Sequence, residues 1–317
     1  MLHAPTSKNS TTVRSERALR LARAALHAAY LVSDDLGAGL AERLFTSPRR
    51  FRRPTRERDA LATGRPFEVE AALHAPRWRG QTRRLAAWRW GQGPAVLLIH
   101  GWQGRGSQLG AFVEPLVAAG LSVVAFDAPG HGDSPGRRAY VTDFADAIAA
   151  VAATCGPVHA TISHSFGAAA TLLAHGRGGL DAPRNVMIAP NVLLDDVVGR
   201  FSRMMGLDEA ARVELMARVG ASAGISLAAL RPEALAAERD TALLVLHDRG
   251  DRESPFVQGE AVAAAWPGAQ LRATEGLGHR KILRDPAVVA AAVEMICAGV
   301  PAPASDLVRE VDRQLLG

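Results

Sequence analysis

From residue 93 onward, the sequence alternates short apolar runs with longer segments of helical periodicity. Six apolar runs are predicted to be strands, at residues 95–100, 121–127, 158–163, 185–190, 242–247 and 270–275. Helical segments lie between most of them, at residues 107–119, 142–154, 166–175 and 255–265, with a last one at 285–299. Strands of a parallel sheet are buried on both faces, so they appear as nearly continuous apolar runs joined by helices. The chain is therefore predicted to be an α/β protein with a mostly parallel central sheet flanked by helices.

Three regions depart from this alternation. Residues 66–90 alternate apolar and polar positions, which predicts two antiparallel strands leading into the sheet. Residues 1–65 contain helical patterns at 16–32 and 36–45 followed by an Arg-rich segment, and residues 191–240 contain helical patches without a strand. We therefore expect an N-terminal helical, Arg-rich extension at 1–65, a core at 66–190 and 241–317, and a helical cap or lid at 191–240.

Charge is distributed unevenly along the chain. Lys and Arg number 37 against 32 Asp and Glu, but residues 1–90 hold 18 basic and 8 acidic side chains, which leaves 19 and 24 for residues 91–317. A basic extension on an acidic domain fits these numbers better than a nucleic-acid-binding protein, because the Arg cluster at 47–59 has no interleaved aromatic side chain besides Phe51. A solvated linker is the favoured interpretation of this cluster over an anion or lipid-headgroup patch. Whether the extension docks on the acidic domain or reaches toward an anionic partner stays open.

Cysteine content and hydropathy indicate a cytoplasmic protein. Cys155 and Cys297 lie in apolar contexts without metal-ligand spacing, which argues against disulfides and zinc. No uncharged apolar stretch reaches the roughly 18 residues of a membrane-spanning helix, so no stable membrane insertion is expected. Residues 1–15 hold Ser and Thr and no acidic residue, slightly like a transit peptide, but a disordered tail is the favoured interpretation.

The sharpest chemical signal is the pentapeptide 163–167, Ser-His-Ser-Phe-Gly, placed between an apolar run and a helical segment. A tight strand-to-helix turn can present the Ser165 hydroxyl to a general base, and it needs small residues two positions to either side. Ser163 and Gly167 meet that size requirement, although Ser163 replaces the glycine of the usual G-x-S-x-G pattern. The pentapeptide alone would be weak evidence, because it also occurs by chance.

A second turn, at residues 99–102, could place a backbone N–H group beside the turn that carries Ser165. Residues 99–102, Ile-His-Gly-Trp, close an earlier predicted strand at the same edge of the sheet. The backbone N–H groups of Trp102 and Phe166 could together form an oxyanion hole. The competing interpretation of the glycines in this turn is a flexible loop. A phosphate-binding loop is disfavoured because no G-K-[ST] or G-x-G-x-x-G pattern follows the strand.

Four motifs, in this order, resemble the α/β-hydrolase superfamily, in a bacterial serine-esterase-like branch: LLIHGWQG, VVAFDAPGHGDS, ATISHSFG and LLVLHDRGD, the last followed by GLGH. The resemblance runs from about residue 67 to residue 298 and implies the α/β-hydrolase fold. It also implies that Ser165 is the nucleophile, Asp251 the acid and His279 the base, in the chain order expected for that superfamily. No metal or organic cofactor is implied, and the partner would be a small-molecule acyl ester or thioester.

Other carboxylates could serve as the acid. Asp248 leaves the same strand tip three residues before Asp251, but lies too close to the strand end to reach across. Asp195 and Asp196 follow the preceding predicted strand, where some relatives carry the acid. Asp251 is favoured over these three. Asp127 is not a candidate for the acid, because it resembles a structural carboxylate that ties the turn after its own strand.

Other histidines could serve as the base. His164 is adjacent to Ser165 and cannot easily fold back to its hydroxyl. His100 and His131 belong to turns that are structural or shape the pocket floor in the resembled superfamily, and Ser134 is interpreted as structural for the same reason. His279 is favoured because of its loop.

The sequence predicts a serine hydrolase that cleaves carboxylic esters or thioesters through an acyl-enzyme intermediate. An acyltransferase or peptidase-type relative and a non-catalytic scaffold are the alternatives. Trp102 would crowd a bulky acyl group. Several flexible apolar residues of the cap either line an acyl pocket or only pack the cap on the core: Phe201, Met204, Met205, Leu207, Leu215 and Met216.

Overall fold

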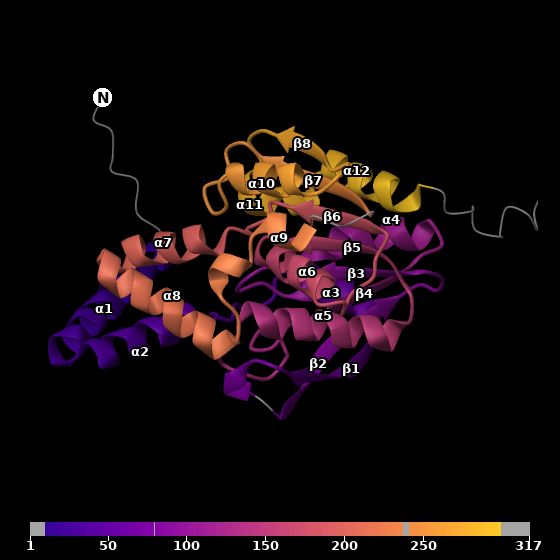
Figure 1. The fold of residues 1–317 in the computed structure, drawn as a ribbon. Helices are drawn as coiled ribbons and strands as arrows, with labels where there is room; N and C mark the ends of the chain where they lie inside the picture. The colour runs from indigo at the N-terminus through magenta and orange to yellow at the C-terminus, as the bar shows by residue number, and fades with distance from the viewer. Residues whose placement is uncertain (1–9, 79, 237–240, 299–317) are drawn as a thin grey trace, which may run out of the picture.

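An eight-stranded sheet with the order β1-β2-β4-β3-β5-β6-β7-β8 forms the centre of the molecule (Figure 1). The structure, a computed structural model, describes residues 10–78, 80–236 and 241–298. The strands are β1 Arg65–Leu73, β2 Gln81–Trp90, β3 Ala95–Ile99, β4 Ser122–Phe126, β5 Val158–His164, β6 Arg184–Ile188, β7 Ala242–Asp248 and β8 Gln270–Thr274. β1, β2 and β4 pair antiparallel, and β4, β3, β5, β6, β7 and β8 pair parallel. The predicted α/β class and the mostly parallel sheet are confirmed.

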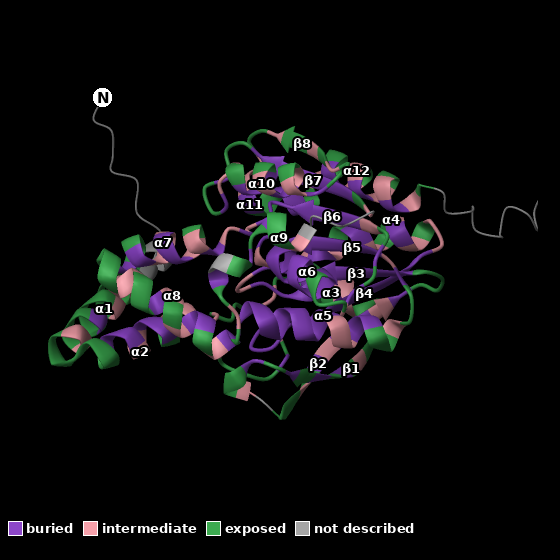
Figure 2. Cartoon of the chain, viewed as in Figure 1, coloured by how far each residue is buried: buried purple, intermediate pink, exposed green. Residues whose placement is uncertain are grey.

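Helices cover both faces of the sheet and produce two apolar layers. α5 Val141–Cys155, α6 Phe166–Gly176 and α10 Val257–Ala265 contribute to one layer, whereas α4 Val113–Ala118 and α12 Pro286–Cys297 contribute to the other. Successive residues of β3 and β4 enter opposite layers and are all buried, as Figure 2 shows for the sheet interior. This two-sided burial explains why these strands lack polar alternation. The fold brings the carboxyl ends of β3, β5, β6 and β7 to one edge of the sheet.

A second helical layer lies beside that edge. It combines α1 Ser10–Val32 and α2 Asp34–Phe45 with two helices inserted between β6 and β7, α7 Leu194–Met205 and α8 Glu209–Ala223 (Figure 1). Contacts between the two segments include the Phe45 and Phe201 rings, with centroids 5.1 Å apart, and the Ser222 hydroxyl, which donates to Glu42 at 2.7 Å. The short helix α9 Pro232–Ala236 completes the insertion. The N-terminal helices therefore pack on the inserted helices far along the chain.

The prediction that the Arg-rich segment is only a solvated linker is wrong, because two of its arginines bind a distant loop. Arg53 forms ion pairs with Asp127 at 2.6 Å and with Asp133 at 2.5 Å. Arg50 donates to the carbonyl oxygens of Gly130, Ser134 and Gly136 at 2.5–3.2 Å. The local charge run suggested exposure, and Arg49, Arg52 and Arg56 are exposed, but the guanidinium groups of Arg50 and Arg53 fit the carboxylates and carbonyls of a loop about 80 positions away. The extension docks on the acidic domain.

Helix α3 Thr55–Ala62 lies within the same segment and was not predicted. Its Glu57 is buried and accepts hydrogen bonds from Arg105 Nε at 2.5 Å, Arg105 Nη2 at 3.0 Å and Ser107 Oγ at 2.8 Å. α3 is mostly polar, and this long-range ion pair adds to the packing of its Leu61 on the core.

The prediction of a disordered tail over residues 1–15 is wrong from Ser10 onward, where α1 begins. Once a helix has started, each further residue adds a hydrogen bond, so α1 extends through polar positions toward the N-terminus. Residues 1–9 lie outside the described part of the chain.

Candidate active site

Ser165 lies on a strained turn between β5 and α6. Its φ of 54° and ψ of −123° fall outside the regions favoured by L-residues. The turn is fixed on two sides, because the Ser165 N–H donates to Ile188 O at 3.1 Å and the Ser165 carbonyl accepts from Asn191 N at 3.1 Å. Gly167 must be small: a Cβ there would lie 2.6 Å from His100 O. The turn therefore projects Ser165 at the carboxyl edge of the sheet.

Three predicted residues from distant parts of the chain meet at this turn. Ser165 Oγ donates to His279 Nε2 at 3.0 Å, and His279 Nδ1 donates to Asp251 Oδ2 at 2.7 Å, with the tautomer assigned from these partners. His279 lies in α11 Gly278–Lys281, after β8, and Asp251 lies in the loop after β7. All three side chains are buried. The arrangement has the nucleophile, base and orienting acid that acyl transfer requires.

The environment of Asp251 keeps its carboxylate ionised. Its Oδ1 accepts from the backbone N–H groups of Glu253 at 2.8 Å and Ser254 at 2.9 Å. Burial raises the pKa of Asp251, but His247, whose Nε2 lies 3.6 Å from Oδ2, and His279 outweigh it, so the pKa lies well below its ordinary value. An ionised Asp251 can hold His279 in the required tautomer and stabilise its protonated form.

The competing carboxylates are not paired with His279, and two of them have other partners. Asp248 accepts from Gly250 N, Thr274 Oγ1 and Leu277 N at 2.9–3.0 Å, which fixes the loop that carries His279. Asp195 and Asp196 lie in the first turn of α7, and Asp196 accepts from Gln258 Nε2 at 3.2 Å.

The competing histidines have structural partners too. His164 Nε2 donates to the carbonyl of His279 at 3.0 Å, and burial together with the nearby His279 lowers the pKa of His164 to about 3. His100 donates to its neighbour's carbonyl and accepts from Ala128 N at 2.9 Å. Burial lowers the pKa of His131 to about 4, and its Nδ1 donates to Pro129 O. These three rings are neutral near pH 7.

The loop after β3 reaches the nucleophile. A Cβ on Gly101 would lie 2.8 Å from Ser165 Cβ, so only glycine permits this approach. The rings of Trp102 and Phe166 meet edge to face with centroids 5.4 Å apart, and both line the adjacent cavity. The two residues whose amides were predicted to form the oxyanion hole therefore flank Ser165, and their role stays a prediction.

Asp127 and Ser134 organise the neighbouring loop, as the sequence suggested. Asp127 accepts from Gly106 N and Asp133 N at 2.8 Å, and Ser134 Oγ donates to Asp127 O at 2.5 Å. Burial raises the pKa of the Asp127 carboxyl, whereas these N–H donors and Arg53 oppose that shift.

A cavity of about 1170 Å³ opens beside Ser165. α7 contributes apolar residues that include Phe201, Met204 and Met205, but the other three residues of the predicted apolar set, Leu207, Leu215 and Met216, do not line it. The N-terminal extension provides part of the opposite wall, including Leu19, Leu40, Leu44 and Phe45. Sequence patterns did not reveal this contribution, because it depends on how α1 and α2 pack across the inserted helices.

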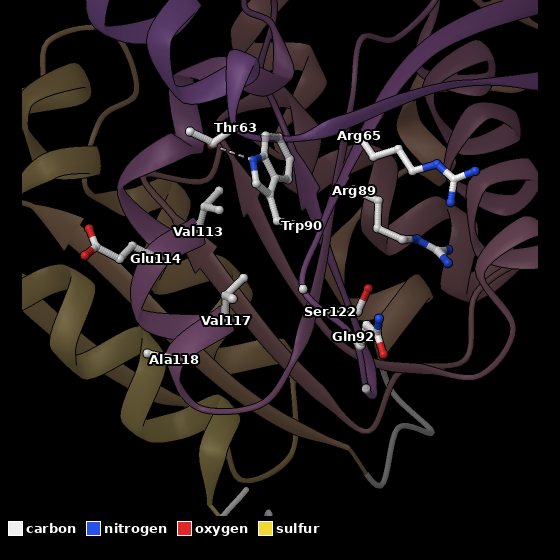
Figure 3. A pocket seen from close by; sticks show the side chains of 12 residues that line it. Thr63, Arg65, Arg89, Trp90, Gln92, Val113, Glu114, Val117, Ala118 and Ser122 are labelled. Atoms are coloured by element: carbon white, nitrogen blue, oxygen red, sulfur yellow. Dashed lines mark hydrogen bonds between the residues drawn. The ribbon is translucent and has the colours of Figure 1, made fainter. Parts of the chain in front are cut away.

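A second hollow, of about 960 Å³, lies at the other edge of the sheet (Figure 3). It surrounds Trp90, whose indole N–H donates to Thr63 Oγ1 at 3.0 Å, and it includes Arg65, Arg89 and Glu114. Trp102, Phe166 and Asn191, which adjoin Ser165, line the first cavity, whereas none of them lines this hollow.

Within residues 10–78, 80–236 and 241–298, no group of three or more His, Cys, Asp or Glu side chains is arranged to hold a metal ion. The same ranges contain no helix that is long and apolar enough to cross a membrane. Cys155 and Cys297 are free thiols.

Comparison with known proteins adds three facts. Residues 96–292 match the sequence model of the Alpha/beta hydrolase family. No curated protein matches the chain. Several solved structures share the fold at low sequence identity, so they support the fold alone.

A thermophilic esterase from Thermogutta terrifontis is 19% identical, with a TM-score of 0.52 over 72% of this chain and 97% of that one. A monoacylglycerol lipase from Paleococcus ferrophilus is 20% identical, with a TM-score of 0.54 over 68% and 98%. A bromoperoxidase from Bacillus anthracis is 15% identical, with a TM-score of 0.54 over 73% and 100%. The shared fold thus carries more than one activity, and the chemistry must be argued from the site.

Proposed function

Because the chain belongs to the alpha/beta hydrolase family, we propose that it is a serine hydrolase that cleaves carboxylic esters or thioesters. The observation that carries this proposal is the continuous hydrogen-bonded series of Ser165, His279 and Asp251, with distances of 3.0 and 2.7 Å. A non-catalytic scaffold would not need these three groups in one buried series. The esterase and lipase among the structural neighbours agree with the reaction class.

The proposed reaction proceeds in two stages. His279 Nε2 accepts the Ser165 proton as Ser165 Oγ attacks the carbonyl carbon, and Asp251 stabilises the resulting imidazolium. The backbone N–H groups of Trp102 and Phe166 bind the oxyanion of the tetrahedral intermediate. His279 then returns the proton to the leaving alcohol or thiol. In the second stage, water takes the place of Ser165 Oγ as the nucleophile, with His279 again as the base, and releases the acid.

The free thiols of Cys155 and Cys297 are consistent with a reducing compartment, so we propose a cytoplasmic site of action.

Labelling with a fluorophosphonate, followed by peptide mass spectrometry, tests the reaction class. We expect one adduct, on Ser165, and none in Ser165→Ala. Ser202→Ala is a matched control, because Ser202 is also buried and its hydroxyl has no partner among the described residues. A folded wild-type protein that carries no adduct on Ser165 would refute the proposal.

Turnover of chromogenic esters gives a second measure. Loss of Ser165 should reduce kcat/KM by a factor on the order of 10⁴ or more, because the nucleophile and base act as one unit. Ser202→Ala should retain the wild-type value.

A further inference from the structure

The charged residues of the cavity beside Ser165 are almost all of one sign. Its lining includes one described carboxylate, Glu16. The cationic side chains are six arginines: Arg43, Arg49, Arg77, Arg137, Arg138 and Arg200. The rest of the lining is mainly apolar, as the α1, α2 and α7 residues show. An apolar cavity with low-dielectric walls concentrates the field of such unbalanced charges.

These six arginines differ from the arginines that hold the fold together. Arg53 and Arg105 are each bound to carboxylates at 2.5–2.6 Å. None of the six cavity arginines is in an ion pair with a carboxylate of residues 10–78, 80–236 or 241–298. Arg77 lies over the Trp78 ring at 5.4 Å and Arg200 donates to Asn191 Oδ1, but no described carboxylate within hydrogen-bond or ion-pair distance neutralises the charge of any of the six.

Two distant segments place the arginines around one opening. The Ala139 N–H donates to Thr46 O at 3.0 Å, and Arg50 Nη2 donates to Gly136 O at 3.0 Å, so residues 46–50 run beside residues 136–139. This pairing brings Arg49 of the extension next to Arg137 and Arg138 of the loop after β4. The arginine group is thus built by the docking of the extension.

Arg200 connects the arginine group to the turn that carries the nucleophile. It is partly buried on α7, and its Nη2 donates to Asn191 Oδ1 at 2.7 Å. Asn191 also donates its backbone N–H to the Ser165 carbonyl. Arg200 is therefore linked to the nucleophile's turn through Asn191.

We propose that the substrate is an acyl ester or thioester with an apolar acyl chain and a phosphate or carboxylate group, and that the cavity arginines bind this anionic group. The inference rests on the proposed hydrolase function of Ser165. Arginine suits the task, because its planar donors bind carboxylate and phosphate oxygens in pairs. A volume of about 1170 Å³ exceeds the usual range for small-ligand pockets and admits both parts of such a molecule.

Two matched substrate pairs test the inference and locate the anionic group. In the first pair, octanoyl-coenzyme A carries phosphates on its leaving group, and S-octanoyl-N-acetylcysteamine is its neutral counterpart. In the second pair, the mono-4-nitrophenyl ester of octanedioic acid carries a carboxylate on its acyl group, and 4-nitrophenyl octanoate is its neutral counterpart. At about 20 mM salt, we expect kcat/KM for the anionic member of at least one pair to be about tenfold higher or more, and the ratio to fall at about 0.5 M salt.

The arginines themselves are tested by the double variant Arg137→Gln/Arg138→Gln, which should reduce that ratio by about tenfold. The double variant Arg20→Gln/Arg56→Gln removes the same charge from exposed positions that do not line the cavity, and it should keep both ratio and activity. A ratio near one for both pairs in the wild type, or a ratio that Arg137→Gln/Arg138→Gln leaves unchanged, would overturn the inference.

Binding to Ser165→Ala separates this inference from the proposed reaction. Calorimetry with octanoyl-coenzyme A and with its neutral counterpart needs no turnover. If the anionic probe binds more tightly than the neutral one, and if Arg137→Gln/Arg138→Gln weakens that preference, the inference is supported even when Ser165 has no catalytic role. Hydrolysis of neutral esters with no preference in binding or turnover would leave the hydrolase proposal standing and refute the anionic substrate.

Discussion

The buried ion pair between Glu57 and Arg105 makes a quantitative prediction about the N-terminal extension. The two side chains are only 5% and 7% exposed. Glu57→Ala removes three hydrogen bonds to Arg105 and Ser107 and leaves the guanidinium with Phe51 O, at 3.4 Å from Nη1. Breaking a buried pair by removing one partner costs about 3–5 kcal/mol, because an uncompensated charge stays behind.

We therefore expect Glu57→Ala to lower the free energy of unfolding in urea by about 3 kcal/mol or more, and the thermal midpoint by about 5–10 °C. Glu260→Ala is the control, because Glu260 is exposed on α10 and has no ion pair within the described residues; its change should stay within about 0.5 kcal/mol. The double variant Glu57→Ala/Arg105→Met removes the stranded charge and should recover part of the loss. A loss below about 1 kcal/mol in Glu57→Ala, or a double variant no more stable than the single one, would refute this account.

Three further predictions concern single residues. Burial raises the pKa of Asp143 to about 7, so between pH 4 and 7 the folded state keeps a proton that the unfolded state has lost, and stability falls as pH rises. This pH dependence amounts to up to about 4 kcal/mol in the free energy of unfolding, and Asp143→Asn should abolish it in urea unfolding at pH 4, 6 and 8. A difference in stability between variant and wild type that does not vary with pH would contradict the prediction. Asp251→Asn should leave the fold intact and lower kcat by a factor on the order of 10⁴, since the base then takes the wrong tautomer; a loss below about tenfold would exclude that role. Gly101→Ala should reduce kcat/KM by about 10²-fold in ester assays with an unchanged circular dichroism spectrum, because its Cβ would lie 2.8 Å from Ser165 Cβ; full activity would show that this approach is not needed.

The strands were predictable because their signal is local. β3, β4 and β7 lie between two helical layers, so each is an apolar run that needs no knowledge of its partners. The turns that carry Ser165 and Gly101 were visible for a similar reason, since small residues stand where the backbone must approach closely.

The docking of the extension was not predictable, because its signal is shared between distant residues. Arg53 looks like a member of a solvated charge run until Asp127 and Asp133 are placed beside it. Glu57 sits in the polar helix α3 and gains its partner 48 positions away, so neither hydrophobic periodicity nor charge pattern reveals it. Sequence reasoning therefore recovered the sheet and its turns, but not the part of the cavity wall that the N-terminal extension supplies.

That shared wall has a thermodynamic consequence. The cavity is formed jointly by α1 and α2 from one end of the chain and by α7 from the insertion, and neither segment encloses a ligand alone. A ligand that contacts both segments binds only when both are docked, so its binding stabilises the docked state. By linkage, docking increases the affinity for the ligand by the same free energy. Saturating ligand should therefore slow amide hydrogen exchange in α1, α2 and α7 more than in the central strands, and substrate affinity becomes a measure of how firmly the N-terminal helices are held.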